Sequence, residues 1–242
     1  MIASVAPCGN QSLAQTVADC RGLVFDLFHT LTCIELTSTG PHTAELLGIE
    51  RVAWSAALNA ARWRLLGEER DPHTIIRRVA LDVDPTLADT VIGQAAATRV
   101  RRFARSLTHP PAESLRVLRA LGARGKRLGL ISDADAGEVA AWPRSSLAPQ
   151  FACALFSCDE GLTKPDPRIY ARCLERLELP ASACLFIGNG GSHELAGARA
   201  VGMGTVLMAG IARRIWPERP LPDLEHADYV IDRLDELLVP DR

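Results

Sequence analysis

Three short apolar segments, each followed at once by polar residues, constrain the fold of this chain more than any other feature. Segments this short and this uniformly apolar are typical of strands in a parallel sheet that is buried on both faces. Asp26 follows the first segment, Ser132 follows the second, and Asn189 lies just beyond the third. The three segments are residues 23–25, 128–131 and 184–187.

Helical patterns separate these segments along the chain. Residues 112–124 and 167–177 carry apolar positions at helical spacing, and two further strand candidates occupy residues 154–157 and 205–208. Strands that alternate with helices indicate an α/β architecture. We therefore predict a Rossmann-like, doubly wound parallel sheet.

One long stretch departs from this alternation. Between the first strand and the next core helix, apolar residues recur at helical spacing with scarcely a strand signal, and Pro72 and Pro85 stand where helices would begin. We interpret this stretch as an inserted helical cap over the carboxyl ends of the strands, where ligands bind in such sheets. The predicted division is a loose N-terminal tail (1–20), an α/β core (21–32 and 106–242) and a helical cap (33–105).

Composition excludes several classes of protein. The chain has 242 residues, of which 48% are hydrophobic and 23% charged, and its formal net charge is -2. This balance is ordinary for a globular protein and suggests no nucleic-acid partner. No signal peptide or membrane span is visible, so we expect a cytoplasmic protein, either a monomer or a homodimer. Seven cysteines without a C-x-x-C pair argue against a zinc cluster or a disulfide framework.

Polar side chains with catalytic potential converge on one edge of the predicted sheet. Because the carboxyl ends of parallel strands meet at the same edge, residues after the three strands should lie together. Lys164, one of only two lysines in the chain, precedes a helix in the sequence Lys-Pro-Asp-Pro. Such a group suits a small anionic substrate held beside a nucleophile. Its members are Asp26, Thr30, Ser132, Asp133, Lys164, Asn189 and Glu194.

Four of these segments together resemble a known family. The resemblance rests on the four ordered motifs of the haloacid dehalogenase (HAD) superfamily, and it covers the chain from about residue 22 onward. The helical insertion is similar in position to the C1 cap of that superfamily. The resemblance implies a hydrolase with a Rossmann-like core. The matching segments are residues 25–31, 131–133, 164–166 and 188–194.

The resemblance also implies roles for individual residues. Asp26 would be the nucleophile and would form a covalent intermediate that water hydrolyses. Thr30 would orient the nucleophile or the attacking water, and Lys164 would neutralise charge between nucleophile and substrate. Ser132 would donate a hydrogen bond to a phosphoryl or carboxylate oxygen. The substrate-binding set implied in this way is Ser132, Asp133, Lys164 and Tyr170.

A magnesium site is implied by the phosphatase branches of the superfamily. Those enzymes hold Mg²⁺ with the nucleophile, with the backbone carbonyl two residues later, and with an acid of the fourth motif. Here these positions are Asp26, Phe28 and Asn189, and Glu194 remains for an outer role. A neutral amide is a poorer ligand than a carboxylate, so we expect weak Mg²⁺ binding.

Departures from the phosphatase pattern leave the substrate class open. Phe28 stands where phosphatases usually carry a second Asp that protonates the leaving group. His29 is either a partly buried structural residue or a surrogate acid. The dehalogenase branch also lacks the second Asp and needs no metal, but its second motif carries Asn where this chain has Asp133. Its carboxylate-binding Arg has only candidates here: Arg51, Arg62 and Arg64.

Three functional hypotheses follow. The first is a phosphatase that acts on a phosphomonoester. The alternative is a 2-haloacid dehalogenase, in which no Mg²⁺ would be needed. The second alternative is a catalytically weakened protein that binds a ligand or partner, favoured by the changes at Phe28 and Asn189 and opposed by the intact Asp26 and Lys164.

Overall fold

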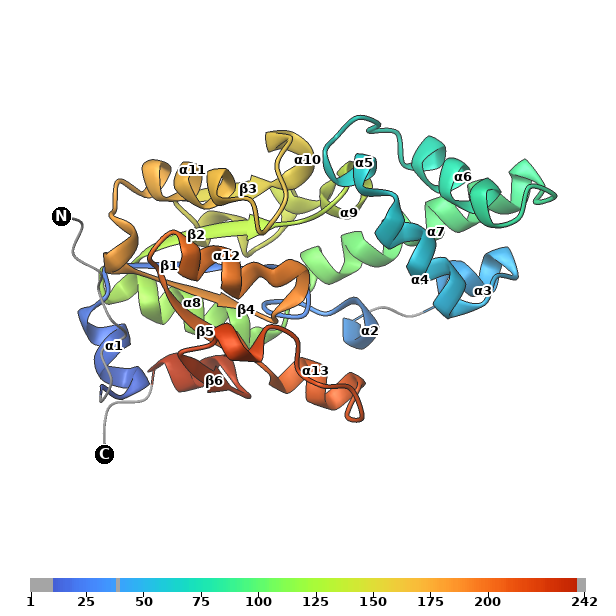
Figure 1. The fold of residues 1–242 in the computed structure, drawn as a ribbon. Helices are drawn as coiled ribbons and strands as arrows, with labels where there is room; N and C mark the ends of the chain where they lie inside the picture. Colours follow the sequence, from blue (N-terminus) through green and yellow to red (C-terminus); the bar gives the residue numbers. More distant parts are fainter. Residues whose placement is uncertain (1–10, 38–39, 239–242) are drawn as a thin grey trace.

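A six-stranded parallel sheet in the order β3-β2-β1-β4-β5-β6 forms the centre of the molecule (Figure 1). The computed structural model describes residues 11–37 and 40–238. This topology confirms the predicted doubly wound α/β fold. The strands are β1 (Gly22–Phe25), β2 (Arg127–Ser132), β3 (Cys153–Phe156), β4 (Cys184–Gly188), β5 (Gly204–Met208) and β6 (Tyr229–Ile231).

The strand order places its switch point between β1 and β4. The chain moves outward in one direction from β1 to β3 and in the other from β4 to β6. Ligands of open α/β sheets bind in the crevice beyond the carboxyl ends of the strands at this point. Phe25 is in register with both Leu130 and Ile187. The residues that follow these strands therefore start from the same edge of the sheet.

Helices cover both faces of the sheet (Figure 1). On one face, Leu23 and Phe25 pack into a buried cluster with residues of α1 and α8. On the other face, Val24 packs with residues of α11 and α12. Every residue of β1 is buried, as an apolar strand between two helical layers requires. The core helices are α1 (Leu13–Asp19), α8 (Ala112–Ala123), α9 (Ala136–Val139), α10 (Ser157–Glu160), α11 (Pro167–Leu177), α12 (Glu194–Ala200) and α13 (Gly210–Ile215).

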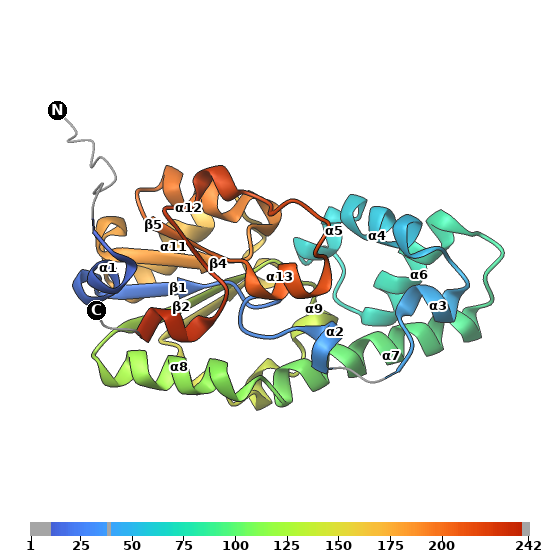
Figure 2. The ribbon, with the colours of Figure 1, turned by 90° about the horizontal axis from the view of Figure 1, so that it is seen from below.

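The segment between β1 and α8 is helical and extends to one side of the sheet (Figure 2). It has its own buried cluster, in which Trp54 and Ile76 take part. Pro72 was expected where a helix begins, and it lies in the first turn of α6. Asp71 caps this helix, and its side chain accepts from the Thr74 N–H (2.7 Å). The helices of this cap are α2 (Ile34–Thr37), α3 (Thr43–Leu47), α4 (Arg51–Ala60), α5 (Arg62–Leu65), α6 (Pro72–Val83) and α7 (Asp89–Thr108).

Helix α7 crosses the predicted boundary between cap and core at residue 105. Ile92 near its beginning belongs to the buried cluster of the cap, whereas Leu107 near its end belongs to the core cluster. One helix of 20 residues thus contributes to both apolar cores, and its end is continuous with the core. The division into cap and core otherwise remains a prediction.

The structure corrects the prediction for residues 13–19 and adds one strand that was not predicted. Residues 13–19 were predicted to be part of a loose tail, but they form α1, in which Ser12 caps the helix and Val17 is buried against the core. Residues 1–10 of that tail lie outside the described residues. Strand β6 was not predicted, because three residues carry too little pattern to stand out. Among the described residues, no helix has the length and apolarity needed to cross a membrane.

Two cap glycines with similar backbone angles test the packing of cap against core. Gly67 (φ 73°) and Gly48 (φ 68°) both adopt the left-handed conformation, which costs other residues about 1–2 kcal/mol. A Cβ on Gly67 would lie 2.0 Å from the carbonyl oxygen of Cys158, whereas one on Gly48 would meet nothing within 4 Å. Gly67→Ala should therefore lower the free energy of unfolding in urea clearly more than Gly48→Ala. Equal losses would contradict this close approach.

Candidate active site

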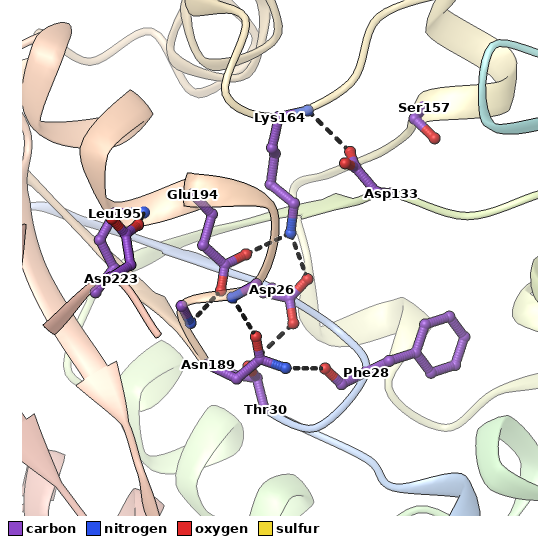
Figure 3. A network of polar contacts seen from close by, with 12 residues as sticks. Asp26, Phe28, Thr30, Asp133, Ser157, Lys164, Asn189, Glu194, Leu195 and Asp223 are labelled. Atoms are coloured by element: carbon purple, nitrogen blue, oxygen red, sulfur yellow. Dashed lines mark hydrogen bonds and ion pairs between the residues drawn. The ribbon is translucent and has the colours of Figure 1, made fainter. Parts of the chain in front are cut away.

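Asp26 is the centre of a buried polar network at the end of β1 (Figure 3). Its side chain is almost inaccessible, and both carboxylate oxygens have partners. Oδ1 accepts from Nζ of Lys164 at 2.6 Å, and Oδ2 accepts from the hydroxyl of Thr30 at 3.0 Å. The backbone N–H of Asp26 donates to Ile187 on β4 (2.9 Å), which fixes the residue at the switch point. The predicted nucleophile is thus held at both oxygens.

Lys164 joins two carboxylates that would otherwise repel one another. Its ammonium group lies 2.6 Å from Asp26 and 2.5 Å from Oε2 of Glu194, and the side chain is 3% exposed. Burial alone would lower the pKa of Lys164, but the charges of Asp26, Glu194 and Asp133 outweigh it and raise the pKa well above its ordinary value. The lysine is therefore a permanent cation beside the nucleophile.

Glu194, at the start of α12, is fully buried behind the lysine. Its Oε1 accepts from the N–H of Gly190 (2.9 Å), and a Cβ on Gly188 would lie only 2.2 Å from that oxygen. Burial and the charge of Asp26 raise the pKa of Glu194 above its ordinary value, although Lys164 opposes the shift. The glycine of the fourth motif thus makes room for a buried carboxylate.

Tyr170, predicted to bind substrate, instead lies beneath the site. The side chain is fully buried, its hydroxyl donates to the backbone carbonyl of Glu194 (2.9 Å), and its ring packs against Phe186. Burial raises the pKa of the phenol. Because no part of the side chain reaches the surface, Tyr170 supports Glu194 rather than a substrate.

Ser132 and Asp133 follow β2 at the same edge. The hydroxyl of Ser132 is buried and has no hydrogen-bond partner among the described residues, so its O–H is available to a ligand. Asp133 accepts the backbone N–H of Lys164 at 2.9 Å, and burial raises the pKa of its carboxyl. Asp133 therefore positions the segment that carries Lys164 (Figure 3).

The residues predicted to hold Mg²⁺ are already engaged with one another. The side-chain amide of Asn189 donates to the carbonyl oxygen of Phe28 at 2.9 Å, and its Oδ1 accepts from the N–H of Gly191 at 2.7 Å. An ion shared by Phe28 and Asn189 would need two oxygens facing it, whereas here an N–H faces an oxygen. Asp26 and Glu194 in turn share the lysine. This donor set does not fit Mg²⁺.

The side chain of Phe28 points away from Asp26 (Figure 3). Its ring packs edge-on against Phe103 of α7, with centroids 5.1 Å apart. His29, the candidate surrogate acid, contacts Glu35 instead, with Nε2 2.8 Å from Oε2. Burial opposes the charge on His29, but hydrogen bonds to Cys33 and Glu35 raise its pKa to about 10. These contacts favour the structural interpretation of His29.

The three arginines considered for substrate binding lie in different environments. Arg51 is exposed and pairs with Glu45. Arg64 is buried and pairs with Asp135 (2.8 Å). Arg62 of α5 donates to the hydroxyl of Thr163 (2.6 Å), the residue before Lys164. Of the three, only Arg62 contacts the segment that carries Lys164.

Two features of the site had no signal in the sequence. Asp223 accepts the N–H groups of Leu195 (2.7 Å) and Ala196 (3.0 Å), and so satisfies the first turn of α12 from a loop distant in sequence. Arg64 and Arg99 of the cap both pair with Glu138 of α9 in the core. These contacts join residues far apart in the chain, which a single sequence cannot reveal.

Comparison with known proteins shows which family the chain resembles. The family model for haloacid dehalogenase-like hydrolases matches residues 20–202. Haloacid dehalogenase-like hydrolase domain-containing protein 3 of Bos taurus is 30% identical over 125 residues, which are 49% of this chain and 50% of that protein. A match to bifunctional epoxide hydrolase 2 of Rattus norvegicus, 30% identical over 102 residues, covers 38% of this chain and 18% of that protein. The chain thus spans half or less of the curated relatives it matches.

Solved structures share the fold over most of their length. L-2-haloacid dehalogenase from Xanthobacter autotrophicus with covalently bound chloropropionic acid has a TM-score of 0.61 and 17% identity, and the match covers 90% of this chain and 97% of that one. A HAD phosphatase from Thermococcus onnurineus has a TM-score of 0.58 and 19% identity, with coverages of 92% and 99%. At these identities the likeness shows the fold, and both kinds of enzyme have it.

Replacement of Asn189 tests the conclusion about magnesium. In Asn189→Asp, a carboxylate without an N–H would face the carbonyl of Phe28, and a cation between the two would relieve their repulsion. We expect saturable Mg²⁺ binding by calorimetry in Asn189→Asp, at least ~10-fold tighter than in wild type. Asn59→Asp, which adds the same charge at an exposed cap position, should match wild type. Saturable Mg²⁺ binding by wild type that is as tight as in Asn189→Asp would overturn the conclusion.

Proposed function

The chain belongs to the haloacid dehalogenase-like hydrolases, and we propose that it hydrolyses small 2-haloacids with Asp26 as the nucleophile. The observation that carries this proposal is the hydrogen bond from Asn189 to the carbonyl of Phe28. It occupies the place where a phosphatase of the family would bring Mg²⁺ to the phosphoryl group. Phe28 also supplies no proton to a leaving group. A halide leaves with its electron pair and needs neither a metal nor a proton.

The reaction proceeds through a covalent ester. An oxygen of Asp26 attacks C2 of the substrate, the new C–O bond forms as the carbon–halogen bond breaks, and the halide departs. Water then attacks the carbonyl carbon of the ester and releases the 2-hydroxy acid and a proton. Lys164 and Thr30 hold the two oxygens of Asp26, which fixes the nucleophile for the displacement.

The substrate carboxylate needs donors of its own. The unpartnered hydroxyl of Ser132 can supply one hydrogen bond. Arg62, which lies on the cap and contacts Thr163 beside the lysine, can supply a charge-assisted bond. We assign these two residues to the carboxylate, one from the core and one from the cap.

Substitution of the nucleophile tests covalent catalysis. Asp26→Asn should lower kcat by at least ~10⁴-fold, because the amide cannot displace the halide. A single turnover of wild type in H₂¹⁸O should place label in the Asp26 side chain, since water attacks the ester at that residue. Mass spectrometry of the peptide measures the label. Unlabelled Asp26, or full turnover by Asp26→Asn, would reject the mechanism.

Arg62 and Arg51 form a matched pair for the carboxylate assignment. Arg62→Ala should raise KM for a 2-haloacid about 10- to 100-fold, as expected for the loss of one charge-assisted hydrogen bond. Arg51→Ala removes an exposed cap arginine whose ion pair in the described part of the chain is with Glu45, and it should change KM less than twofold. If both variants raise KM equally, long-range charge rather than a contact at Arg62 is responsible.

A phosphomonoesterase is the second candidate. Asp133 in the second motif and the buried Glu194 in the fourth resemble the phosphatase branches and favour it. Wild type would then turn over alkyl or aryl phosphates in the presence of Mg²⁺ and leave 2-haloacids unchanged. A protein that has kept the fold without catalysis would turn over neither class, and Asp26→Asn would bind ligands as wild type does.

A further inference from the structure

Three side chains of different chemistry meet where the chain leaves the nucleophile for the cap. They are the imidazole of His29, the thiol of Cys33 and the carboxylate of Glu35, and their ligand atoms all lie within 4.8 Å of one another. Oε2 of Glu35 is 2.8 Å from Nε2 of His29 and 3.3 Å from Sγ of Cys33. Neither Cys33 nor Glu35 has a part in the hydrolysis proposed above.

These ligands suit a zinc ion. Zn²⁺ takes imidazole nitrogen and carboxylate oxygen at about 2.0–2.2 Å and thiolate sulfur at about 2.3 Å. A tetrahedral arrangement with these bonds separates the ligand atoms by roughly 3.3–3.6 Å. The two pairs that share Oε2 of Glu35, at 2.8 and 3.3 Å, need to move apart by only a fraction of an ångström. We propose that His29, Cys33 and Glu35 form a binding site for a transition-metal ion of the Zn²⁺ type, with water as the fourth ligand.

The surrounding structure holds the three side chains in place. His29 has a left-handed backbone (φ 64°), and its N–H donates to the carbonyl of Thr32 at 2.6 Å, which closes a tight loop. The ring of Trp216 packs edge-on against the imidazole, with centroids 5.2 Å apart. Cys33 immediately precedes α2, so the thiol and Glu35 share one turn of chain. A site held in this way loses little freedom when an ion binds.

An ion can reach this site from solvent. Cys33 is buried, but the side chains of His29 and Glu35 are 22% and 38% exposed. In the structure, Oε2 of Glu35 accepts from the Cys33 thiol and is also hydrogen-bonded to Nε2 of His29. Binding would displace the proton of the His29 imidazolium and that of the Cys33 thiol, since metal ligands must be deprotonated. Arg102 lies close enough to Glu35 to interact with its charge, which moderates the affinity for a cation.

Occupation of the site would have a structural consequence. His29 lies between Phe28 and Thr30 on the loop that follows Asp26, and Glu35 lies on α2, the first helix of the cap. A metal bound to both would tie the loop after Asp26 to the first helix of the cap.

Cobalt gives the most direct test, because a thiolate ligand of Co²⁺ produces an intense charge-transfer absorption. Wild type titrated with Co²⁺ should develop this band, and Zn²⁺ should abolish it by competition. Cys33→Ser should lose the band, because the serine hydroxyl has nearly the same size and shape as the thiol but supplies no thiolate ligand. Loss of a residue that supports a metal ligand without touching the ion weakens metal binding ~10–100-fold. Because His29→Ala removes a direct ligand, it should weaken Co²⁺ binding by more than this.

Matched controls come from the rest of the chain. His226→Ala disrupts the other group of metal-compatible side chains in the described residues, Asp223, Glu225 and His226, and should leave the band unchanged. Cys153→Ser removes a different, partly buried thiol and should also leave it unchanged. Zn²⁺ should raise the melting temperature of wild type and of both controls but not of Cys33→Ser. No band in wild type, or a band that survives in Cys33→Ser, would overturn the proposal.

Discussion

The site depends on the two ion pairs that the ammonium group of Lys164 makes with Asp26 and Glu194. Both carboxylates are buried, and two such charges cannot remain close together without a cation, because the cost of desolvation adds to their repulsion. The lysine meets this need and has almost no exposure of its own. Much of the nearby structure serves the same purpose: Asp133 holds the lysine backbone, and Tyr170 holds the backbone of Glu194.

The same arrangement determines which chemistry the site can support. Asn189 and the carbonyl of Phe28 satisfy one another through a hydrogen bond, so the positive charge beside the nucleophile comes from Lys164. Phe28 turns its ring toward Phe103 at the base of the cap and gives the leaving group no acid. Displacement of a halide requires neither a second cation nor a proton, and for this reason we propose a dehalogenase rather than a phosphatase. The family contains both kinds of enzyme among its solved structures.

Much of the fold could be predicted because its signals are local. Strands β1, β2 and β4 are short apolar runs that end at polar residues, and each lies within one residue of its predicted bounds. Helix α1 and strand β6 were missed for the opposite reason: α1 has one buried residue, Val17, and β6 has three residues in all. The helices of the segment between β1 and α8 were predicted from periodicity, but the predicted boundary at residue 105 falls inside α7, which ends at Thr108.

The sequence by itself determined which residues stand at the ends of the strands, and hence that Asp26, Ser132 and Asn189 share one edge of the sheet. It also identified Lys164 through its scarcity and its proline-rich context. Only the tertiary structure decided how these groups pair. It turned the amide of Asn189 to Phe28, buried Tyr170 beneath Glu194, and brought Arg62 to Thr163. The order of elements along the chain fixes the edge of the sheet at which a side chain emerges. The partner of that side chain depends on packing between segments that are distant in sequence. A single sequence carries no record of that packing.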